Sequence, residues 1–381
     1  VSDDDRFIEG FSRAGYEIHF LRPQPRHPQD DARVRTHYYP NFFAATRSLP
    51  TCLRRPLWPF LFQLIVVPRT LRLARELHPG VVIGHSHYST AATHQCRAKL
   101  GIPSAVKLFG VMDLVHTEWP AAKYVFKNLE QLSALRYAQD AWIVLDDGTR
   151  GGEILRGRGL PADRIHFLPN GLDLEWADAH VDRAAARESF QLPSNAPVVL
   201  FLSRLVRSKR PLDFVHAAAR VVAGADTGAV FVFAGDGPMR DACQRAAAGA
   251  GLAGRFRFLG TVPHHDIPRL MAASDLFVST SELTNRALPT CEAMLCGVPV
   301  VVYDAGDTRT VVRDGETGVV VTDGDVVALA DSIARLLGNQ AERRRLADNA
   351  RSLARKTFTS WDQRIGMEME IIEGLEGRGK E

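Results

Sequence analysis

The sequence has few cysteines, and their spacing favours neither a disulfide framework nor a structural zinc site. Five cysteines occur among 381 residues, an odd number, at positions 52, 96, 243, 291 and 296. No Cys-x-x-Cys pair is present. This usage is typical of a protein in a reducing compartment, so we expect free thiols and a cytoplasmic location.

Long apolar runs are also missing. No stretch of 18 consecutive apolar residues occurs, so the sequence predicts no membrane-spanning helix. The acidic start, Asp3 to Asp5, lacks the apolar segment of a signal peptide. With 45% hydrophobic and 24% charged residues and no low-complexity tract, the chain is expected to be globular and long enough for two domains.

The net charge of +3 is unevenly distributed. Residues 1–172 contain 22 Lys and Arg against 16 Asp and Glu, which gives +6, and the remainder contains 25 against 28, which gives −3. Such asymmetry indicates different partners for the two halves. Nucleic-acid binding is not expected, because the basic residues are not interleaved with stacking aromatics in one compact motif.

Short apolar runs alternate with longer amphipathic stretches along the whole chain, which predicts an α/β protein with open parallel sheets. In the first half the expected strands are Tyr16–Phe20, Val81–Gly84, Ser104–Leu108, Trp142–Leu145 and Arg164–Leu168. In the second half they are Val198–Leu202, Val230–Ala234, Phe256–Leu259, Leu276–Ser279, Val298–Val302 and Val319–Val321.

Two turn-forming clusters interrupt this alternation, at 169–171 and 192–197, and indicate a domain boundary between them. We therefore expect domains at residues 1–172 and 190–357. The first domain begins unusually. Arg6–Ala14 is predicted to be a helix, so the strand and glycine-rich turn that normally open a doubly wound domain are not expected before it.

Three loops of the second domain are expected at the carboxyl edge of its sheet, where open α/β sheets bind ligands. Arg204 and Lys209 follow the first strand and suit a diphosphate, although a solvated basic loop is the alternative. Gly235 and Gly237 follow the second strand and permit close backbone approach, or form a simple turn. Glu292 lies at the start of a helix, where it could accept two ribose hydroxyls or merely complement the helix dipole.

Taken in order, these segments resemble the donor-binding domain of the retaining GT-B glycosyltransferases of family 4, the glycosyl transferases group 1. The resemblance runs from about 198 to 322 and is carried by R-x4-K, GDGP, FLGTVPHHDIP and EAMLCGVPVVVYDAGDTRTVVRDGETGVVV. A weaker resemblance covers AGYEIHFL, VVIGHSHY and FLPNGLD in the first half. It implies two doubly wound Rossmann-like domains facing a central cleft and a C-terminal segment, 358–381, that packs on the N-terminal domain, which in this sequence is expected to lack its first strand.

The resemblance also implies roles for individual residues. Arg204 and Lys209 would bind the donor diphosphate and act in catalysis by stabilising it as the leaving group. Glu292 would bind the ribose. Further donor contacts would come from Gly235, Gly237, the backbone near Val262 at the base, and the amides of Ala287 and Leu288. Neither a metal nor a cofactor is implied, and the run 322–325, which looks like a metal-binding DxD, is better interpreted as the N-cap of a helix beginning at Val326.

The sequence departs from the family pattern at two places. Thr284 stands where the family has the first glutamate of E-x7-E, so Thr284 and Asn285 are the candidates for contacts to the sugar. In the first domain Phe109 precedes Gly110 where a histidine is usual. We therefore place Phe109, Gly110 and His87 in the acceptor pocket, with His116 as an alternative.

The resulting prediction is a retaining, metal-independent glycosyltransferase (EC 2.4, hexosyltransferase type) that transfers a sugar from a nucleotide-diphosphate sugar to an acceptor hydroxyl. Cell-surface polysaccharide, glycolipid or secondary-metabolite synthesis are the expected settings. The alternatives are a nucleotide-binding partner protein with impaired catalysis, and a GT-B-like epimerase or C–N coupling enzyme.

A membrane surface is a further expected partner. Within residues 47–75, six arginines flank the apolar run Leu57–Val67. Eleven residues are too few to cross a bilayer, but a basic amphipathic segment can lie on an anionic membrane. The alternative is a core helix whose arginines face water. The sequence thus leaves open whether the protein is free in the cytoplasm or peripheral on the inner face of a membrane.

Overall fold

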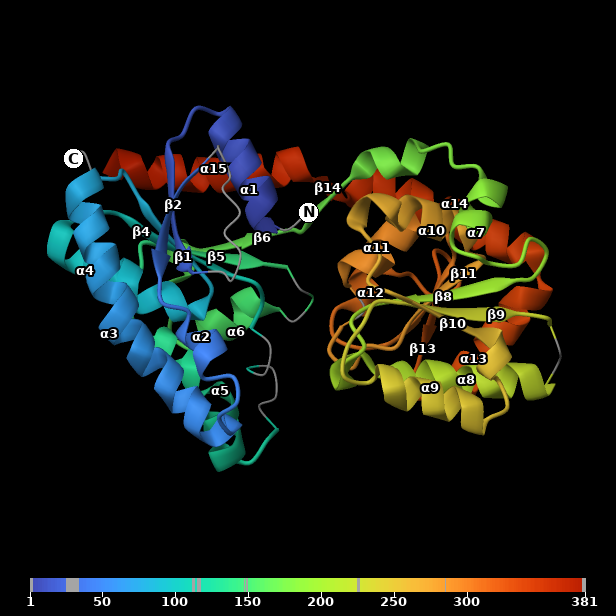
Figure 1. The fold of residues 1–381 in the computed structure, drawn as a ribbon. Helices are drawn as coiled ribbons and strands as arrows, with labels where there is room; N and C mark the ends of the chain where they lie inside the picture. The colour runs from blue at the N-terminus through green and yellow to red at the C-terminus, as the bar shows by residue number, and fades with distance from the viewer. Residues whose placement is uncertain are drawn as a thin grey trace. The chain divides into compact units, whose positions relative to one another are not determined.

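The computed structural model describes residues 3–24, 34–111, 114, 118–146, 148, 150–224, 227–284 and 286–378. The chain forms two compact units, one of residues 1–171 and 361–381 and the other of residues 172–360. Figure 1 shows helices and strands alternating in both. Residues 173–189, which the sequence interpretation left between the domains, therefore belong to the second unit.

The second unit is built on a parallel sheet that, in the described residues, has six strands in the order β10-β9-β8-β11-β12-β13. The strands are β8 (Val198–Leu202), β9 (Val230–Ala234), β10 (Phe256–Gly260), β11 (Leu276–Ser279), β12 (Val300–Tyr303) and β13 (Val319–Val321). The predicted strands are thus confirmed to within two residues at each end. The chain runs outward from β8 to β10, then returns to β11 on the other side of β8, which defines a doubly wound sheet.

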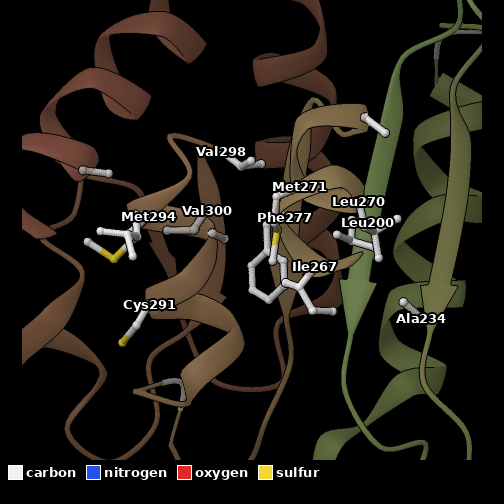
Figure 2. Packing of buried hydrophobic residues seen from close by; sticks show 14 of the residues in the cluster. Leu200, Ala234, Ile267, Leu270, Met271, Phe277, Cys291, Met294, Val298 and Val300 are labelled. Atoms are coloured by element: carbon white, nitrogen blue, oxygen red, sulfur yellow. The ribbon is translucent and has the colours of Figure 1, made fainter. Parts of the chain in front are cut away.

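Both faces of this sheet are buried, because neighbouring residues of each strand point in opposite directions. Leu200 belongs to one apolar cluster and Phe201 to the other. Figure 2 shows the first cluster, in which Phe277 of β11 lies beside Met271 and Ile267. Uninterrupted apolar runs such as VVLFL therefore predict central strands well.

Helices cover each face of the sheet, as Figure 1 shows. One cluster is completed by α8 (Pro211–Gly224), α9 (Arg240–Gly249) and α13 (Val326–Gly338). The other is completed by α10 (Ile267–Ala273), α11 (Leu288–Leu295) and α14 (Gln340–Thr357). Short helices α7 (Arg183–Ser189) and α12 (Thr308–Val311) also belong to this unit.

The first unit contains two separate parallel sheets in its described residues. One has four strands, β3 (Val82–His85), β4 (Ser104–Leu108), β5 (Ala141–Leu145) and β6 (Ile165–Leu168), and the other pairs β1 (Ile18–Pro23) with β2 (Val34–Tyr39). The sequence analysis missed β2 because its residues, VRTHYY, form no continuous apolar run. The helices are α1 (Asp3–Arg13), α2 (Phe42–Ala45), α3 (Thr51–Leu77), α4 (Thr90–Leu100), α5 (Ala121–Ala134), α6 (Gly151–Gly157) and α15 (Trp361–Arg378).

Helix α3 is longer than the sequence analysis expected. It has 27 residues and contains Pro56, Pro59 and Pro68. Within the described residues, the 22-residue stretch Pro56–Leu77 is long and apolar enough to cross a membrane, a test that buried helices of soluble proteins also pass. The sequence analysis counted only uninterrupted apolar residues and so did not identify this helix, whose length and composition alone do not show that it crosses a membrane.

A buried cluster of charges joins the last helix to the first unit's sheet. Lys107 of β4 lies 3.0 Å (Nζ to Oε1) from Glu368 of α15, and both side chains are fully buried. The guanidinium of Arg364 pairs with Glu368 and lies 3.2 Å from Oδ1 of Asp3. Lys107 also pairs with Asp3. Two cations therefore face two carboxylates inside the unit.

We predict that Lys107→Met destabilises the protein by about 3–5 kcal/mol, because it leaves two buried carboxylates with only one cation, Arg364. The double variant with Glu368→Met is expected to recover much of this loss, since it removes both charges. Urea unfolding followed by circular dichroism measures the effect. Arg13→Met, which breaks an exposed pair with Glu9, is the control and should cost less than about 1 kcal/mol.

Candidate functional site

The order of strands in the second unit locates the site. The chain reverses direction across the sheet between β8 and β11, which pair directly. In doubly wound sheets, ligands bind beyond the carboxyl ends of the strands at such a point. The loops that leave these two strands, 203–210 and 280–287, contain half of the residues predicted for the donor.

Gly235 and Gly237 lie in the turn that follows β9, and they allow the β8 loop to pack against that turn. A Cβ on Gly235 would lie 2.1 Å from the carbonyl oxygen of Ser203, and one on Gly237 would lie 2.4 Å from that of Leu205. Gly235 has φ +124° and Gly237 φ +157°. The amide of Leu205 donates to the carbonyl of Asp236 at 2.9 Å. Because these two glycines have no side chain, the backbone of the β8 loop and that of the turn after β9 can lie in direct contact.

The two predicted phosphate-binding cations lie on the β8 loop in different environments. Arg204 is exposed, and its guanidinium makes no ion pair or hydrogen bond among the described residues. Lys209 is half-buried and donates from Nζ to Oγ of Ser281 at 3.2 Å. Thr280, fully buried, donates its hydroxyl to the carbonyl of Lys209 at 2.8 Å and so ties the two loops together.

Neighbouring acidic residues are engaged in structural roles. Arg210 lies 2.8 Å from Asp323 and 3.5 Å from Glu282. Asp325 accepts a hydrogen bond from the amide of Ala328 at 2.9 Å, which confirms the predicted N-cap of α13. In the DxD-like run, Asp323 therefore forms an ion pair and Asp325 caps a helix.

Glu292 lies on α11 and is 6% exposed. Burial raises the pKa of its carboxyl to about 7, while the nearby charge of His264 lowers this pKa and that of Asp173 raises it. No side-chain hydrogen bond of Glu292 is present in the part of the chain that the structure describes. A buried carboxylate without a protein donor is suited to accept hydrogen bonds from a ligand.

The residues before Glu292 form the start of α11 and the loop that leads into this helix. Ala287 is the N-cap of α11 and Leu288 its first residue, and neither amide donates to another described residue. Thr284 is buried, and its hydroxyl accepts the amide of Arg286 at 3.0 Å. Asn285 lies outside the described residues. Val262, after β10, packs against the apolar cluster below α11.

A pair that the sequence analysis missed lies beside Glu292. Nε2 of His264 is 2.8 Å from Oδ2 of Asp173, and the ring of Trp176 lies 4.8 Å from the imidazole. The sequence analysis quoted Asp173 in the turn FLPNGLD and His264 in FLGTVPHHDIP, but gave neither residue a role. Because 91 residues separate them, no local pattern could have paired them.

The candidates in the first unit lie at the ends of β3 and β4. Strand β3 ends at His85, and His87 begins the next turn, 3.8 Å (Nε2 to Oε2) from Glu130. Phe109 is 44% exposed just beyond β4 and is followed by Gly110 with φ +96°. His116 lies outside the described residues. These residues stay candidates for acceptor contacts.

Comparison with known proteins accounts for both units. The sequence model for glycosyl transferases group 1 matches residues 182–353, and that for glycosyltransferase family 4 matches residues 5–176. The second unit thus matches the group 1 glycosyltransferases, and the first matches glycosyltransferase family 4. Among curated glycosyltransferases, alpha-D-kanosaminyltransferase from Streptomyces kanamyceticus is 30% identical over 258 residues, which cover 66% of this chain and 64% of that protein. The chain thus spans less than two thirds of the length of this relative.

The structure has the GT-B fold of this glycosyltransferase family. Sucrose-phosphate synthase from Thermosynechococcus elongatus aligns with a TM-score of 0.76 at 20% identity, covering 98% of this chain and 92% of that one. Anabaena HepE, solved in complex with UDP-glucose, aligns with a TM-score of 0.70 at 20% identity, covering 93% and 99%. At these identities the likeness establishes the fold alone.

We predict that Gly235→Ala weakens nucleoside diphosphate binding at least tenfold. The added Cβ cannot fit beside the Ser203 carbonyl, so the β8 loop that carries Arg204 must move. Gly249→Ala, at the end of α9 with nothing within 4 Å of the new Cβ, is the matched control. Isothermal titration with UDP, GDP and ADP measures the change, and equal affinities for the two variants would contradict the prediction.

Proposed function

We propose that the protein is a retaining, metal-independent glycosyltransferase that transfers a sugar from a nucleotide-diphosphate sugar to an acceptor hydroxyl. The observation that carries this proposal is the placement of Arg204, Lys209 and Glu292. Two cations lie on the loop after β8 and a buried carboxylate lies on α11, which follows β11, and β8 and β11 meet at the reversal point of the sheet. This combination suits a ligand with a diphosphate at one end and a vicinal diol at the other.

In this proposal each residue acts on a defined part of the donor. Arg204 and Lys209 neutralise the diphosphate as it leaves, which stabilises the charge that develops in the transition state. Glu292 accepts the ribose hydroxyls, and the free amides of Ala287 and Leu288 add donors at the start of α11. The leaving diphosphate takes the proton of the acceptor hydroxyl, and the new bond forms on the face of the sugar that the diphosphate leaves.

Similar proteins support the choice of a nucleotide-sugar donor, and the roles of two aspartates support a mechanism without a metal. HepE, which shares the fold, has been solved with UDP-glucose, and the curated relative is named for the transfer of kanosamine. Asp323 and Asp325 are the acidic pair that could hold a divalent ion. Asp323 already forms an ion pair with Arg210, and Asp325 already caps α13.

Arg204→Ala and Lys209→Ala are each expected to reduce sugar transfer by about two to three orders of magnitude, the usual effect of removing one charge-stabilising donor. A radiolabelled panel of UDP-, GDP- and ADP-sugars with hydroxyl acceptors measures the transfer. Arg207→Ala, an exposed arginine of the same loop, is the control. Full activity of both site variants would contradict the proposal.

The same assay separates the alternatives. NMR of the product tells whether the anomeric configuration is retained, and EDTA tells whether a metal is needed. Tight binding of a nucleoside diphosphate without turnover on any acceptor would instead indicate a catalytically impaired partner protein. The buried Thr284, whose hydroxyl is held by the backbone, makes this outcome the one to test first.

We also propose that the outer face of α3 binds an anionic membrane surface. On its inner face Phe62 and Val66 pack into the unit. On the outer face Leu53, Phe60 and Leu64 are 58%, 59% and 58% exposed. Arg72 and Arg75 are exposed further along the same helix. A helix that is buried on one side and that also exposes apolar and basic residues suits a surface-lying orientation.

Phe60→Ser with Leu64→Ser is expected to abolish sedimentation with vesicles rich in phosphatidylglycerol. Each substitution removes an apolar side chain worth about 1.5–3 kcal/mol of burial in the interface. Val327→Ser, which alters a 47% exposed residue of α13, is the control. Binding by the unaltered protein should weaken as salt rises, and equal sedimentation with neutral phosphatidylcholine vesicles would contradict the proposed role of the arginines.

A further inference from the structure

An aspartate–histidine pair lies at the carboxyl edge of the four-stranded sheet in the first unit. His85 is the last residue of β3, and its Nδ1 is 2.7 Å from Oδ1 of Asp4, in the first turn of α1. Neither residue was predicted as part of a site. Because open parallel sheets bind ligands beyond the carboxyl ends of their strands, the pair lies where a ligand of this unit is expected.

Three aromatic rings surround the imidazole of His85. The ring of Phe7 meets it edge-on with 5.4 Å between the centroids, and that of Phe20 does so at 6.0 Å. The ring of Phe109 lies 6.3 Å away. The His85 side chain is 17% exposed. The carboxylate of Asp4 and these rings therefore hold the imidazole in one orientation.

The hydrogen bond to Asp4 occupies only one of the two ring nitrogens. This bond from His85 holds the pKa of the Asp4 carboxyl below its usual value, although burial opposes the effect. Nε2 of His85 forms no hydrogen bond with a described residue, and it is not one of the buried nitrogens that lack a partner. One nitrogen is thus fixed by the protein and the other is left for a ligand, the arrangement in which a carboxylate orients a functional histidine.

Phe109 offers an apolar surface at the same edge. Its side chain is 44% exposed, two residues beyond Lys107, which is the register partner of His85 in the neighbouring strand. The family resemblance places a histidine at position 109, and here β3 brings an imidazole to this edge instead. Sugar and cyclitol rings have hydroxyls around the rim and C–H groups on their faces. An aromatic ring beside a hydrogen-bonding nitrogen suits such a polyol.

We propose that Nε2 of His85 binds a hydroxyl of a sugar or cyclitol acceptor, and that Asp4 is the positioning residue that orients the imidazole. Phe109 packs against the ring of this acceptor. A hydroxyl both donates and accepts, so it can bond to Nε2 whether or not this nitrogen carries a proton. The inference rests on the proposed function, sugar transfer to a hydroxyl, and it names the chemical class of the acceptor.

Two substitutions of His85 separate a ligand contact from a structural one. The amide of asparagine reaches about as far as Nδ1 of histidine, so His85→Asn keeps the bond to Asp4 and loses the group at Nε2. The amide of glutamine reaches about as far as Nε2, so His85→Gln keeps the ligand contact. We expect His85→Asn to weaken polyol binding about five- to tenfold, the usual effect of one hydrogen bond, and His85→Gln to retain most of the affinity. A purely structural role predicts the reverse order and would overturn the inference.

The probes are methyl α-D-glucoside and myo-inositol, titrated by NMR against the chain together with whichever of UDP, GDP and ADP it binds. Nucleotide affinity, measured by isothermal titration, should be the same for the variants and the unaltered chain, because no donor residue is changed. His78→Asn is the control for a histidine substitution. This residue is exposed at the end of α3, and asparagine tolerates its φ of +48°.

Asp4→Ala removes the orienting carboxylate and is expected to weaken polyol binding about threefold. It should add little to the loss caused by His85→Asn, because both substitutions act on the same contact. Asp5→Ala, which changes the next residue of α1, an exposed one, is the matched control. Fully additive losses for Asp4→Ala and His85→Asn would contradict the positioning role of Asp4.

The outcomes distinguish this inference from the proposed function. If the polyols bind and His85→Asn weakens their binding, but no sugar is transferred to any acceptor, the proposed function is wrong and the polyol site at His85 stands. If sugar is transferred and His85→Asn binds the polyols as well as the unaltered chain does, only the inference is wrong. The inference is also wrong if neither polyol binds to the unaltered chain.

Discussion

The loops of the second unit can meet only because positions 235 and 237 have no side chains. The turn after β9 lies directly against the backbone of the β8 loop, and a single methyl group at Gly235 would overlap a carbonyl oxygen. That β8 loop carries Arg204 and Lys209, and Lys209 in turn contacts the β11 loop through Ser281. The positions of the phosphate-binding candidates thus depend on one close backbone contact, which stiffens the site before any ligand arrives.

Much of the second unit could be predicted from the sequence, because its strands are buried on both faces and therefore read as continuous apolar runs. Strand β2 could not, since its VRTHYY lies in a two-stranded sheet and is only half-buried. The candidate donor residues were found through a family resemblance and the rule for strand edges. The pairing of Asp173 with His264 was beyond reach, because it depends on how distant loops fold together. The burial of Thr284 could not be predicted either, because a threonine side chain can face water or form a hydrogen bond with the backbone.

The chain uses charge in two opposite ways. Around Lys107 and Arg364 opposite charges pair with one another in the interior of the first unit, and these pairs hold α15 there. Around Arg204 a cation is left exposed at the edge of a sheet. A buried cluster of opposite charges suits assembly, whereas an exposed cation suits recognition of an anionic ligand. The net charges of the two halves do not reveal this difference, which is one of local pairing.

The prolines of α3 have a consequence for how this helix can meet lipid. A proline has no amide hydrogen, so Pro68 cannot donate to the carbonyl of Leu64, one turn earlier on the outer face. Inside a bilayer that oxygen would rely on a local adjustment of the helix or on a neighbouring side chain, whereas at the hydrated boundary water and lipid headgroups can also donate to it. A helix that lies on the membrane surface therefore makes the smaller demand on this part of the backbone.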